Sequence, residues 1–369
     1  MLKTVWYIAI FGSLLMISCT GQGTHGKTGS VEEAFVTSLI EDIDKYVTVE
    51  EIKPIDDSVL FSNVSKMVSD ELGNYIILDS RGAIVSLSPE GAPGPLKLMR
   101  GRASNEYVSA LDICYFDGQI CILEDAGIKV FEIANTHNSY QIDLREVRSP
   151  VDAISSVPGN KFYMFSAYSA SAKNDKKGHD NTLRLINGRG QILSEFIPRE
   201  DCTFSMNNIS QSRDNTYYLR PQSSESTFYK LGVDGITPAF RVDFGEKAMP
   251  ARYYYNVANE DIGAYMMSDY YKLPMDLHDT KDYVYCRFCG SQASECSLVY
   301  SRRTQKCIAW KNTNQDGEFR VVGSDDNCFI IIPSNIEAQY GPLGQIIQPL
   351  LKEKCAEGQR AIVKVKFNF

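Results

Sequence analysis

Arginine, glutamate and tyrosine side chains that could bind a ligand occur in the polar segments between apolar stretches of this chain. The candidates for ligand contact are Arg81, Arg100, Arg102, Glu106, Tyr107, Arg220, Tyr253, Tyr254 and Tyr255. Tyrosine offers an apolar ring and a polar hydroxyl at once, so together with arginine and carboxylates it suits a sugar or a peptide. The alternative is that Asp79-Ser80 and Glu124-Asp125 only form polar turns and that the tyrosines only pack the loops.

Residues that could carry out catalysis are scarce. The chain has no Gly-x-Ser-x-Gly, P-loop or His-Glu-x-x-His sequence. It holds 4 histidines, of which His137, His179 and His278 lie in three different inter-strand regions. If they converged on a metal ion, the site would favour a lyase or a hydrolase. The sequence instead favours binding without catalysis and without a cofactor, with that metal enzyme as the alternative.

Two pairs of cysteines could be joined by a disulfide or by zinc. Cys114 and Cys121 flank a predicted hairpin turn at Asp117-Gly118, which places them directly opposite each other. Opposed Cβ atoms lie about 5 Å apart in a hairpin and about 3.8 Å apart in a disulfide, so a bridge would be strained. Cys286 and Cys289 have the spacing of a zinc site. They lie on a predicted strand, however, which points them to opposite faces and favours packing as small apolar residues.

The first residues are typical of an export signal. An apolar stretch, Val5–Leu15, is too short to span a bilayer. The residues up to Cys19 resemble a bacterial lipobox, in which the cysteine becomes lipidated; the alternative is an ordinary signal peptide with an incidental cysteine. We therefore predict a lipoprotein signal over residues 1–18 and a lipidated, flexible tether over residues 19–44.

The elements that must position these side chains form a repeat. A turn, an apolar strand, a polar turn and a second strand recur along the chain, as in the residues GNYIILDSRGAIVSL that begin at Gly73. The centres of the apolar strands are Leu78, Leu123, Met164, Tyr218, Cys286 and Ile331. Three of the five intervals, of 45, 41 and 45 residues, match the ~40–50 residues of a propeller blade, and the third and fourth intervals, of 54 and 68 residues, contain insertions. Six copies predict an all-β fold, a single six-bladed β-propeller over residues 45–369.

Both ends of this region read as strands. Val47–Ile55 precedes the first repeat, and Ala361–Phe369 alternates apolar and polar residues at the end of the chain. A propeller avoids open sheet edges when one blade is built from both ends of the chain, so we expect these two strands in one blade. A short helix is predicted over Ile336–Lys354, where Asn335 could cap its start and Gly341-Pro342 would disrupt its first turns.

Composition limits the possible partners. The 369 residues carry a formal net charge of −8, which argues against nucleic acid as the main ligand. Apolar residues make up 43%, enough to form a core, and 21 Tyr with 17 Phe favour strands.

With these motifs, the chain resembles the six-bladed β-propeller lipoproteins of Bacteroides-type bacteria, which are related to NHL-repeat propellers. The resemblance covers residues 45–369 and rests on the Cys19 lipobox, the first repeat, the residues Pro238–Gly245 and the closing strand. Where that family often has Gly-Pro-Gly-Glu-Tyr, this chain has Ala103-Ser104-Asn105-Glu106-Tyr107. The resemblance implies a fold and a cellular location and gives no reaction.

The expected role is therefore that of a binding or scaffold module attached to a membrane by its lipid. Its partner would be a glycan, a peptide or another envelope protein, held on the loops of the propeller. The residues Thr20–Lys27 include no acidic side chain. Because surface-export signals in such bacteria are typically acidic at this position, we expect a lipid-anchored protein of the bacterial outer membrane that faces the periplasm.

Overall fold

The computed structural model describes residues 31–145, 147, 151–166, 181–198, 209–220, 224–254, 267–312, 319–333 and 341–369. The predicted signal peptide and Cys19 lie outside the described residues, as do His179 and Tyr255. Among the described residues, no helix has both the length and the apolar character needed to cross a membrane.

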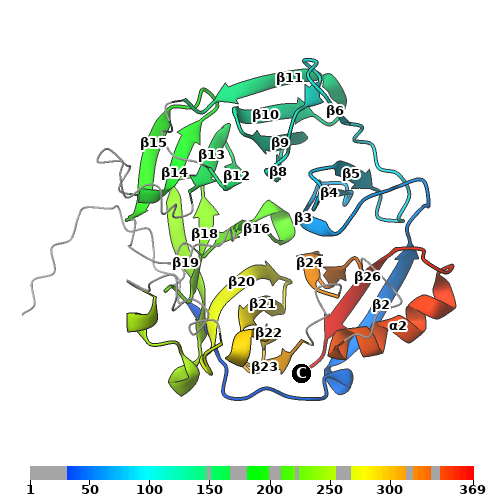
Figure 1. Ribbon diagram of the computed structural model, residues 1–369, viewed down its shortest axis with the longest axis vertical. Coiled ribbons are helices and arrows are strands. Elements are labelled where there is room, and N and C mark those ends of the chain that lie inside the picture. Colours follow the sequence, from blue (N-terminus) through cyan, green and yellow to red (C-terminus); the bar gives the residue numbers. More distant parts are fainter. Residues whose placement is uncertain are drawn as a thin grey trace, which may run out of the picture. The chain divides into compact units, whose positions relative to one another are not determined.

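Six antiparallel sheets form the blades of the fold (Figure 1). Blade 1 contains β3 (Val64–Ser69), β4 (Tyr75–Asp79) and β5 (Ile84–Leu87). Blade 2 contains β8 (Asp112–Phe116), β9 (Gln119–Glu124), β10 (Gly127–Glu132) and β11 (Asn135–Asp143). Blade 3 contains β12 (Ala153–Val157), β13 (Lys161–Phe165), β14 (Asn181–Asn187) and β15 (Ile192–Pro198).

The second half of the ring is built in the same way. Blade 4 contains β16 (Ile209–Gln211), β17 (Tyr217–Leu219), β18 (Thr227–Gly232) and β19 (Gly235–Asp243), with β1 (Glu32–Phe35) added at its outer edge. Blade 5 contains β20 (Lys272–Asp279), β21 (Tyr283–Cys289), β22 (Glu295–Ser301) and β23 (Cys307–Lys311). Blade 6 contains β24 (Val321–Ser324), β25 (Phe329–Ile331), β26 (Ala361–Phe367) and β2 (Val47–Pro54).

The smaller elements lie between these strands. A two-stranded parallel sheet, β6 (Met99–Arg100) with β7 (Glu106–Tyr107), connects blade 1 to blade 2. Short 3-10 helices span Asp44–Tyr46, Arg213–Asn215, Gly245–Lys247, Ala251–Tyr253 and Ser291–Ala293. The α-helix α2 spans Pro342–Lys354.

The first strands of the six blades surround the central axis (Figure 1). Each packs beside the first strand of the next blade, and β24 of blade 6 packs beside β3 of blade 1, so the ring is closed. The six apolar strands found in the sequence are the second strands of the six blades, from β4 with Leu78 to β25 with Ile331. The predicted six-bladed β-propeller is confirmed.

Blade 6 joins the two ends of the folded ring. Strand β2 pairs antiparallel with β26, from Val47 opposite Phe367 to Pro54 opposite Ala361. The prediction that both ends of the chain share one blade is therefore confirmed. This pairing covers what would otherwise be two unpaired sheet edges.

Residues 31–46, which we call the N-terminal strap, run along the outer edges of blades 4, 5 and 6. Strand β1 pairs in parallel with β19, Ile40 forms a parallel bridge with Trp310 in β23, and the chain then enters β2. We expected a flexible tether as far as residue 44. Residues 31–44 are instead packed against the ring, because Ala34, Val36 and Ile43 bury their apolar side chains there.

Helix α2 begins later than we expected. Gly341 is its N-cap and Pro342 its first residue. Proline suits this position, because the first helical N–H has no partner within the helix. Gly341-Pro342 thus starts the helix rather than disrupting it. Leu343, Ile347 and Leu351 pack against the core of blade 6.

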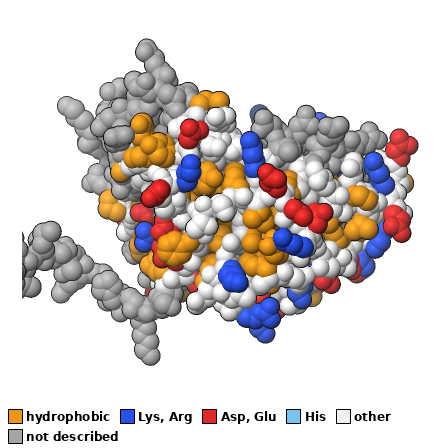
Figure 2. Space-filling view, turned by 90° about the horizontal axis from the view of Figure 1, so that it is seen from below, with side chains coloured by type: hydrophobic (Ala, Val, Ile, Leu, Met, Phe, Trp, Pro, Cys, Tyr) orange, Lys and Arg blue, Asp and Glu red, His pale blue; other side chains and the backbone are white. Residues whose placement is uncertain are grey.

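The apolar cores lie between neighbouring blades. In one cluster Cys121 and Leu123 of blade 2 meet Tyr163 and Phe165 of blade 3. Figure 2, the view from below Figure 1, shows the outer side of the molecule, where apolar side chains alternate with Lys, Arg, Asp and Glu. The surface seen there is mixed, as in most soluble proteins.

The cysteines of the described residues are free thiols. Cys114 in β8 lies directly opposite Cys121 in β9, as the hairpin predicted. Cys286 and Cys289 lie on strand β21, also as predicted. Burial raises the pKa of the Cys286 thiol well above its ordinary value, so this side chain acts as a small apolar group.

Candidate functional site

The connections of a propeller emerge at two ends of the ring. Successive antiparallel strands run in opposite directions, so the turns between second and third strands share one end with the links from blade to blade. We call this end the loop face. The predicted ligand-binding residues belong to these connections or to the strand ends beside them.

The structure brings the predicted residues of blades 1 and 2 together on the loop face. Arg100 donates hydrogen bonds to the carbonyl oxygens of Val108 (2.9 Å) and Arg81 (3.4 Å). The Tyr107 hydroxyl accepts a hydrogen bond from the backbone N–H of Ile84 (3.1 Å). Because Tyr107 is only 3% exposed, its ring supports the loop and is not presented at the surface.

Glu106 also stabilises its own loop. Its carboxylate accepts a hydrogen bond from the backbone N–H of Ala103 (2.8 Å), and Lys129 donates a hydrogen bond to its backbone oxygen. Arg81 and Arg102 are exposed. These two arginines are therefore the predicted side chains of blades 1 and 2 that are best placed to meet a ligand.

The remaining predicted residues that the structure describes lie elsewhere on the ring. Arg220 is 1% exposed and Tyr254 is 7% exposed, so neither presents its side chain to a ligand in this structure. The ring of Tyr253 packs 5.9 Å from that of Tyr270. Tyr254 lines a cavity of about 130 Å³ that opens beside blade 4.

A pocket opens at the centre of the ring. This axial pocket has a volume of about 270 Å³ and is lined mainly by first strands of the blades. Its charged or titratable lining residues are Lys66, Asp112, Asp276, His278, Arg287 and Arg320. Two of them, Asp112 and Arg320, stand at or just before the start of a first strand, which is the loop-face end of that strand.

Two ion-paired groups occupy the walls of the axial pocket. The Lys66 ammonium lies 2.7 and 2.8 Å from the two carboxylate oxygens of Asp112. The backbone N–H of Ile154 in blade 3 also donates to this carboxylate, at 2.8 Å. On the other side, Arg287 donates to Asp276 at 2.8 Å and to Glu295 at 2.8 Å.

Burial and neighbouring charges act against each other in this pocket. Burial raises the pKa of Asp112, and the Lys66 ammonium opposes that shift. For Asp276, burial also raises the pKa, but the guanidinium groups of Arg287 and Arg320 outweigh it and hold the pKa below its ordinary value. Burial lowers the pKa of His278 to about 4, so its ring is neutral at neutral pH.

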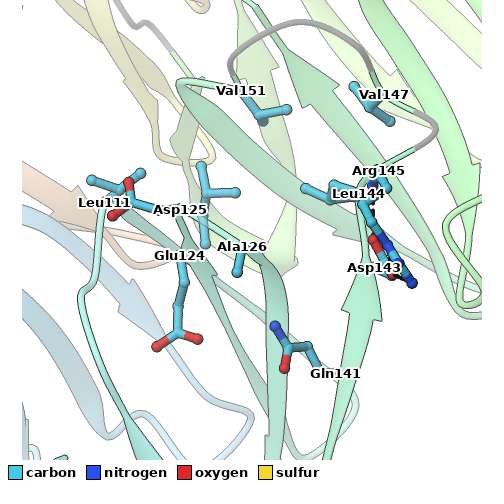
Figure 3. A pocket seen from close by; sticks show the side chains of 11 residues that line it. Leu111, Glu124, Asp125, Ala126, Gln141, Asp143, Leu144, Arg145, Val147 and Val151 are labelled. Carbon is cyan, nitrogen blue, oxygen red and sulfur yellow. Dashed lines mark hydrogen bonds and ion pairs between the residues drawn. The ribbon is translucent and has the colours of Figure 1, made fainter.

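A second and larger pocket adjoins the axial one. This blade 2–3 pocket has a volume of about 690 Å³ (Figure 3). Leu144, Val147 and Val151 form its apolar part, and Arg145 lies beside Asp143 as its ion-pair partner. Leu111 lines both pockets, so the two hollows are neighbours.

Glu124 is the most buried charged group of the blade 2–3 pocket. It is 7% exposed, and one of its carboxylate oxygens accepts a hydrogen bond from the backbone N–H of Val108 at 2.5 Å. The neighbouring Asp125 is exposed. We considered the alternative that these residues only form a polar turn; here they also line a cavity.

Two of the three histidines considered for a metal site, His137 and His278, are described, and they lie on different blades. His137 is on β11, the outermost strand of blade 2, and lies 3.4 Å from the Asn105 amide. His278 is on β20, the innermost strand of blade 5. Within the described ranges, no three His, Cys, Asp or Glu side chains are grouped so that they could hold a metal ion.

Sequence reasoning missed the charged residues of the axial pocket. Lys66 and Arg287 are each the only charged residue of their strand, and this position in the sequence could have identified them. Charged residues are almost never fully buried unless they are paired. A charge at such a position therefore indicates a partner, although not which residue it is.

A closed ring of six sheets defines a β-propeller of six blades. The chain belongs to the six-bladed β-propeller family DUF5128, which matches residues 99–332. A search of the curated proteins found no match.

Solved structures share the fold. A protein of Bacteroides fragilis that is described as exported is 13% identical, with a TM-score of 0.69 over 92% of this chain and 100% of that chain. The extracellular domain of a one-component system from B. thetaiotaomicron is 10% identical, with a TM-score of 0.41 over 82% of this chain and 32% of that one. Virginiamycin B lyase from Staphylococcus aureus is 11% identical, with a TM-score of 0.38 over 82% and 80%. At these identities the likeness concerns the fold alone.

Proposed function

We propose that this protein is a binding module of the cell envelope that captures a glycan, a peptide or a partner protein on its loop face without transforming it. One observation carries the proposal: two adjoining pockets open on that face and share Leu111 as a common wall. Propellers of many functions use this end of the ring, because loops held by a rigid scaffold are free to vary.

The blade 2–3 pocket is the main recognition surface in this proposal. Its volume of about 690 Å³ lies within the ~300–1,000 Å³ of ordinary ligand sites. Its lining combines the aliphatic side chains of Leu144, Val147 and Val151 with the acidic residues Glu124 and Asp125 (Figure 3). Such a mixture can bury the apolar face of a ligand while its polar groups are hydrogen-bonded.

A binding experiment tests this role. Soluble protein that begins after Cys19 is applied to glycan and peptide arrays, beside the variant Leu144→Arg, which places a charge in the apolar part of the pocket. The matched control is Leu193→Arg, because Leu193 is 46% exposed on β15 and does not line the pocket. We expect capture to be lost in the first variant and retained in the second.

The outcomes are separable. Equal capture by wild type and Leu144→Arg would move the site away from this pocket. The double variant Arg81→Ala/Arg102→Ala should weaken capture only if the ligand also reaches the loops of blades 1 and 2. Turnover of any bound array ligand would contradict the non-catalytic role and favour the lyase or hydrolase alternative.

We place the protein on the bacterial outer membrane, anchored by lipid on Cys19 and facing the periplasm, as an NHL-like propeller lipoprotein. The lipobox, the lack of acidic residues in Thr20–Lys27 and a solved neighbour described as exported support this placement. The variant Cys19→Ala should release the protein from membranes. Protease cleavage on intact cells would contradict the periplasmic orientation.

A further inference from the structure

The axial pocket contains one cation that forms no ion pair with a described carboxylate, although its charge helps to lower the pKa of Asp276. Lys66 is paired with Asp112, and Arg287 is shared between Asp276 and Glu295. Arg320 instead donates a hydrogen bond to the backbone oxygen of Val64. In the described part of the chain, no carboxylate lies within ion-pair distance of its guanidinium.

The charges of this group balance as a whole, because Lys66, Arg287 and Arg320 face Asp112, Asp276 and Glu295. Of the three cations, Arg320 is the one without an ion pair among the described residues. The guanidinium of Arg320 has five N–H donors, and Val64 uses only part of them. Arginine binds carboxylates in a planar, two-bond geometry, so the free donors suit a ligand carboxylate.

His278 supplies an acceptor in the same pocket. It is 5% exposed, and its Nδ1 lies 3.1 Å from the backbone oxygen of Gln211. In a neutral ring Nδ1 must then carry the hydrogen, which leaves Nε2 as an acceptor. No described residue donates a hydrogen bond to Nε2, and the side chain lines the pocket. A ligand hydroxyl could therefore be the missing donor.

The remaining walls are apolar. Met67, Leu111, Met275, Val321 and Val322 line the pocket between the charged groups. A methionine side chain adapts to irregular apolar surfaces. These residues suit the C–H face of a small ring.

We propose that the axial pocket binds a sugar acid, with the ligand carboxylate on Arg320 and a ligand hydroxyl donated to His278. This deepens the proposed function and rests on it, because it assigns a ligand class to one of the two loop-face pockets. At about 270 Å³ the pocket is smaller than ordinary drug-sized sites, so it accepts one sugar unit, either free or at the end of a chain.

The charges disfavour the other small ligands of this size. An amino acid or an amine would need a free carboxylate for its ammonium group, but Asp112 and Asp276 are already paired with Lys66 and Arg287. A neutral sugar would leave Arg320 without an anionic partner. A carboxylate next to hydroxyl groups satisfies both Arg320 and His278.

Calorimetry on the full soluble protein tests the inference with glucuronate and galacturonate as probes and glucose and galactose as their neutral counterparts. The variant Arg320→Gln removes the cation, and Arg320→Lys retains it. The matched control is Arg303→Gln, because Arg303 is exposed in the turn between β22 and β23, at the opposite end of the ring. Thermal melts of all variants check that the ring is folded.

We expect wild type and Arg303→Gln to bind at least one sugar acid more tightly than its neutral counterpart. Binding should weaken at least tenfold in Arg320→Gln and be partly retained in Arg320→Lys. Rising salt should weaken it as well, because a charge pair contributes.

Three results would overturn the inference. They are failure of wild type to bind either sugar acid, equal binding by folded Arg320→Gln, and Arg320-dependent binding of peptide carboxyl termini in place of sugar acids. The variant Leu144→Arg separates this inference from the proposed function. If array ligands are captured in a way that depends on Leu144, but no sugar acid binds, the proposed function stands. Only the assignment of a sugar acid to the axial pocket is then wrong.

Discussion

Acidification should destabilise this protein through His278. The side chain is 5% exposed, and burial lowers its pKa from 6.5 to about 4, while Asp276 acts in the opposite direction. Between these two pH values the unfolded chain binds a proton that the folded chain does not bind. The stability that depends on a neutral His278 is therefore complete above pH 6.5 and is lost progressively as the pH falls towards 4.

The size of the effect follows from the two pKa values. A pKa of 6.5 in the unfolded state and about 4 in the folded state corresponds to about 3 kcal/mol of unfolding free energy. Most of this, about 2.5 kcal/mol, should be lost by pH 4.5.

Urea denaturation at several pH values between 7 and 4.5 measures this loss. Carboxylates also titrate in this range, so the informative quantity is the difference between wild type and His278→Gln, which keeps a polar side chain that cannot titrate. The variant should lose about 2.5 kcal/mol less than wild type over this pH range. His137→Gln serves as the control, because His137 is exposed and should leave the wild-type profile unchanged. Parallel profiles for wild type and His278→Gln would refute the reasoning.

Other changes test the packing of the ring and of the N-terminal strap. Lys66→Met leaves the Asp112 carboxylate, which is 2% exposed, without its cation. The unfolding free energy should fall by about 3–5 kcal/mol. The double variant Lys66→Met/Asp112→Leu, which also removes the carboxylate, should restore most of this loss. Chemical denaturation measures the unfolding free energy of both variants. If Lys66→Met were as stable as wild type, the stabilising pair of Lys66 with Asp112 would be contradicted. Glu32→Gln weakens the contact of the strap with Arg302, at 3.0 and 3.1 Å. Because this pair is partly exposed, we expect the unfolding free energy to fall by less than about 1 kcal/mol. Proteolysis within the strap should nevertheless become faster, and an unchanged cleavage rate would contradict a role of this contact in holding the strap. Trp310→Ala removes a fully buried indole and should cost about 3–5 kcal/mol in thermal or chemical unfolding; a cost near zero would mean that the site is not well packed.

The blades could be predicted because their signal is local. Each second strand is a short apolar run bounded by turn residues, and this pattern repeats at the length of a blade. The N-terminal strap gave no such signal. Glu32–Phe35 begins with two acidic residues, and its strand depends on the edge of β19, which exists only after blade 4 has formed.

The site could be predicted only in part, for a related reason. Residue type and loop position indicated Arg81 and Arg102, and both are exposed. They also indicated Tyr107, but its hydroxyl bonds to the Ile84 N–H and its ring is buried. The axial pocket was not foreseen, because Lys66 and Arg320 come from opposite ends of the chain and meet only when the ring closes.

The N-terminal strap has a mechanical consequence. A pull on the chain ahead of Val31 first reaches β1, its pairing with β19 and the contact of Glu32 with Arg302. It next reaches the bridge between Ile40 and Trp310. Only then would tension load the pairing of β2 with β26, which closes the ring. Three attachments in series would therefore have to separate before tension reaches the pairing that keeps the ring closed.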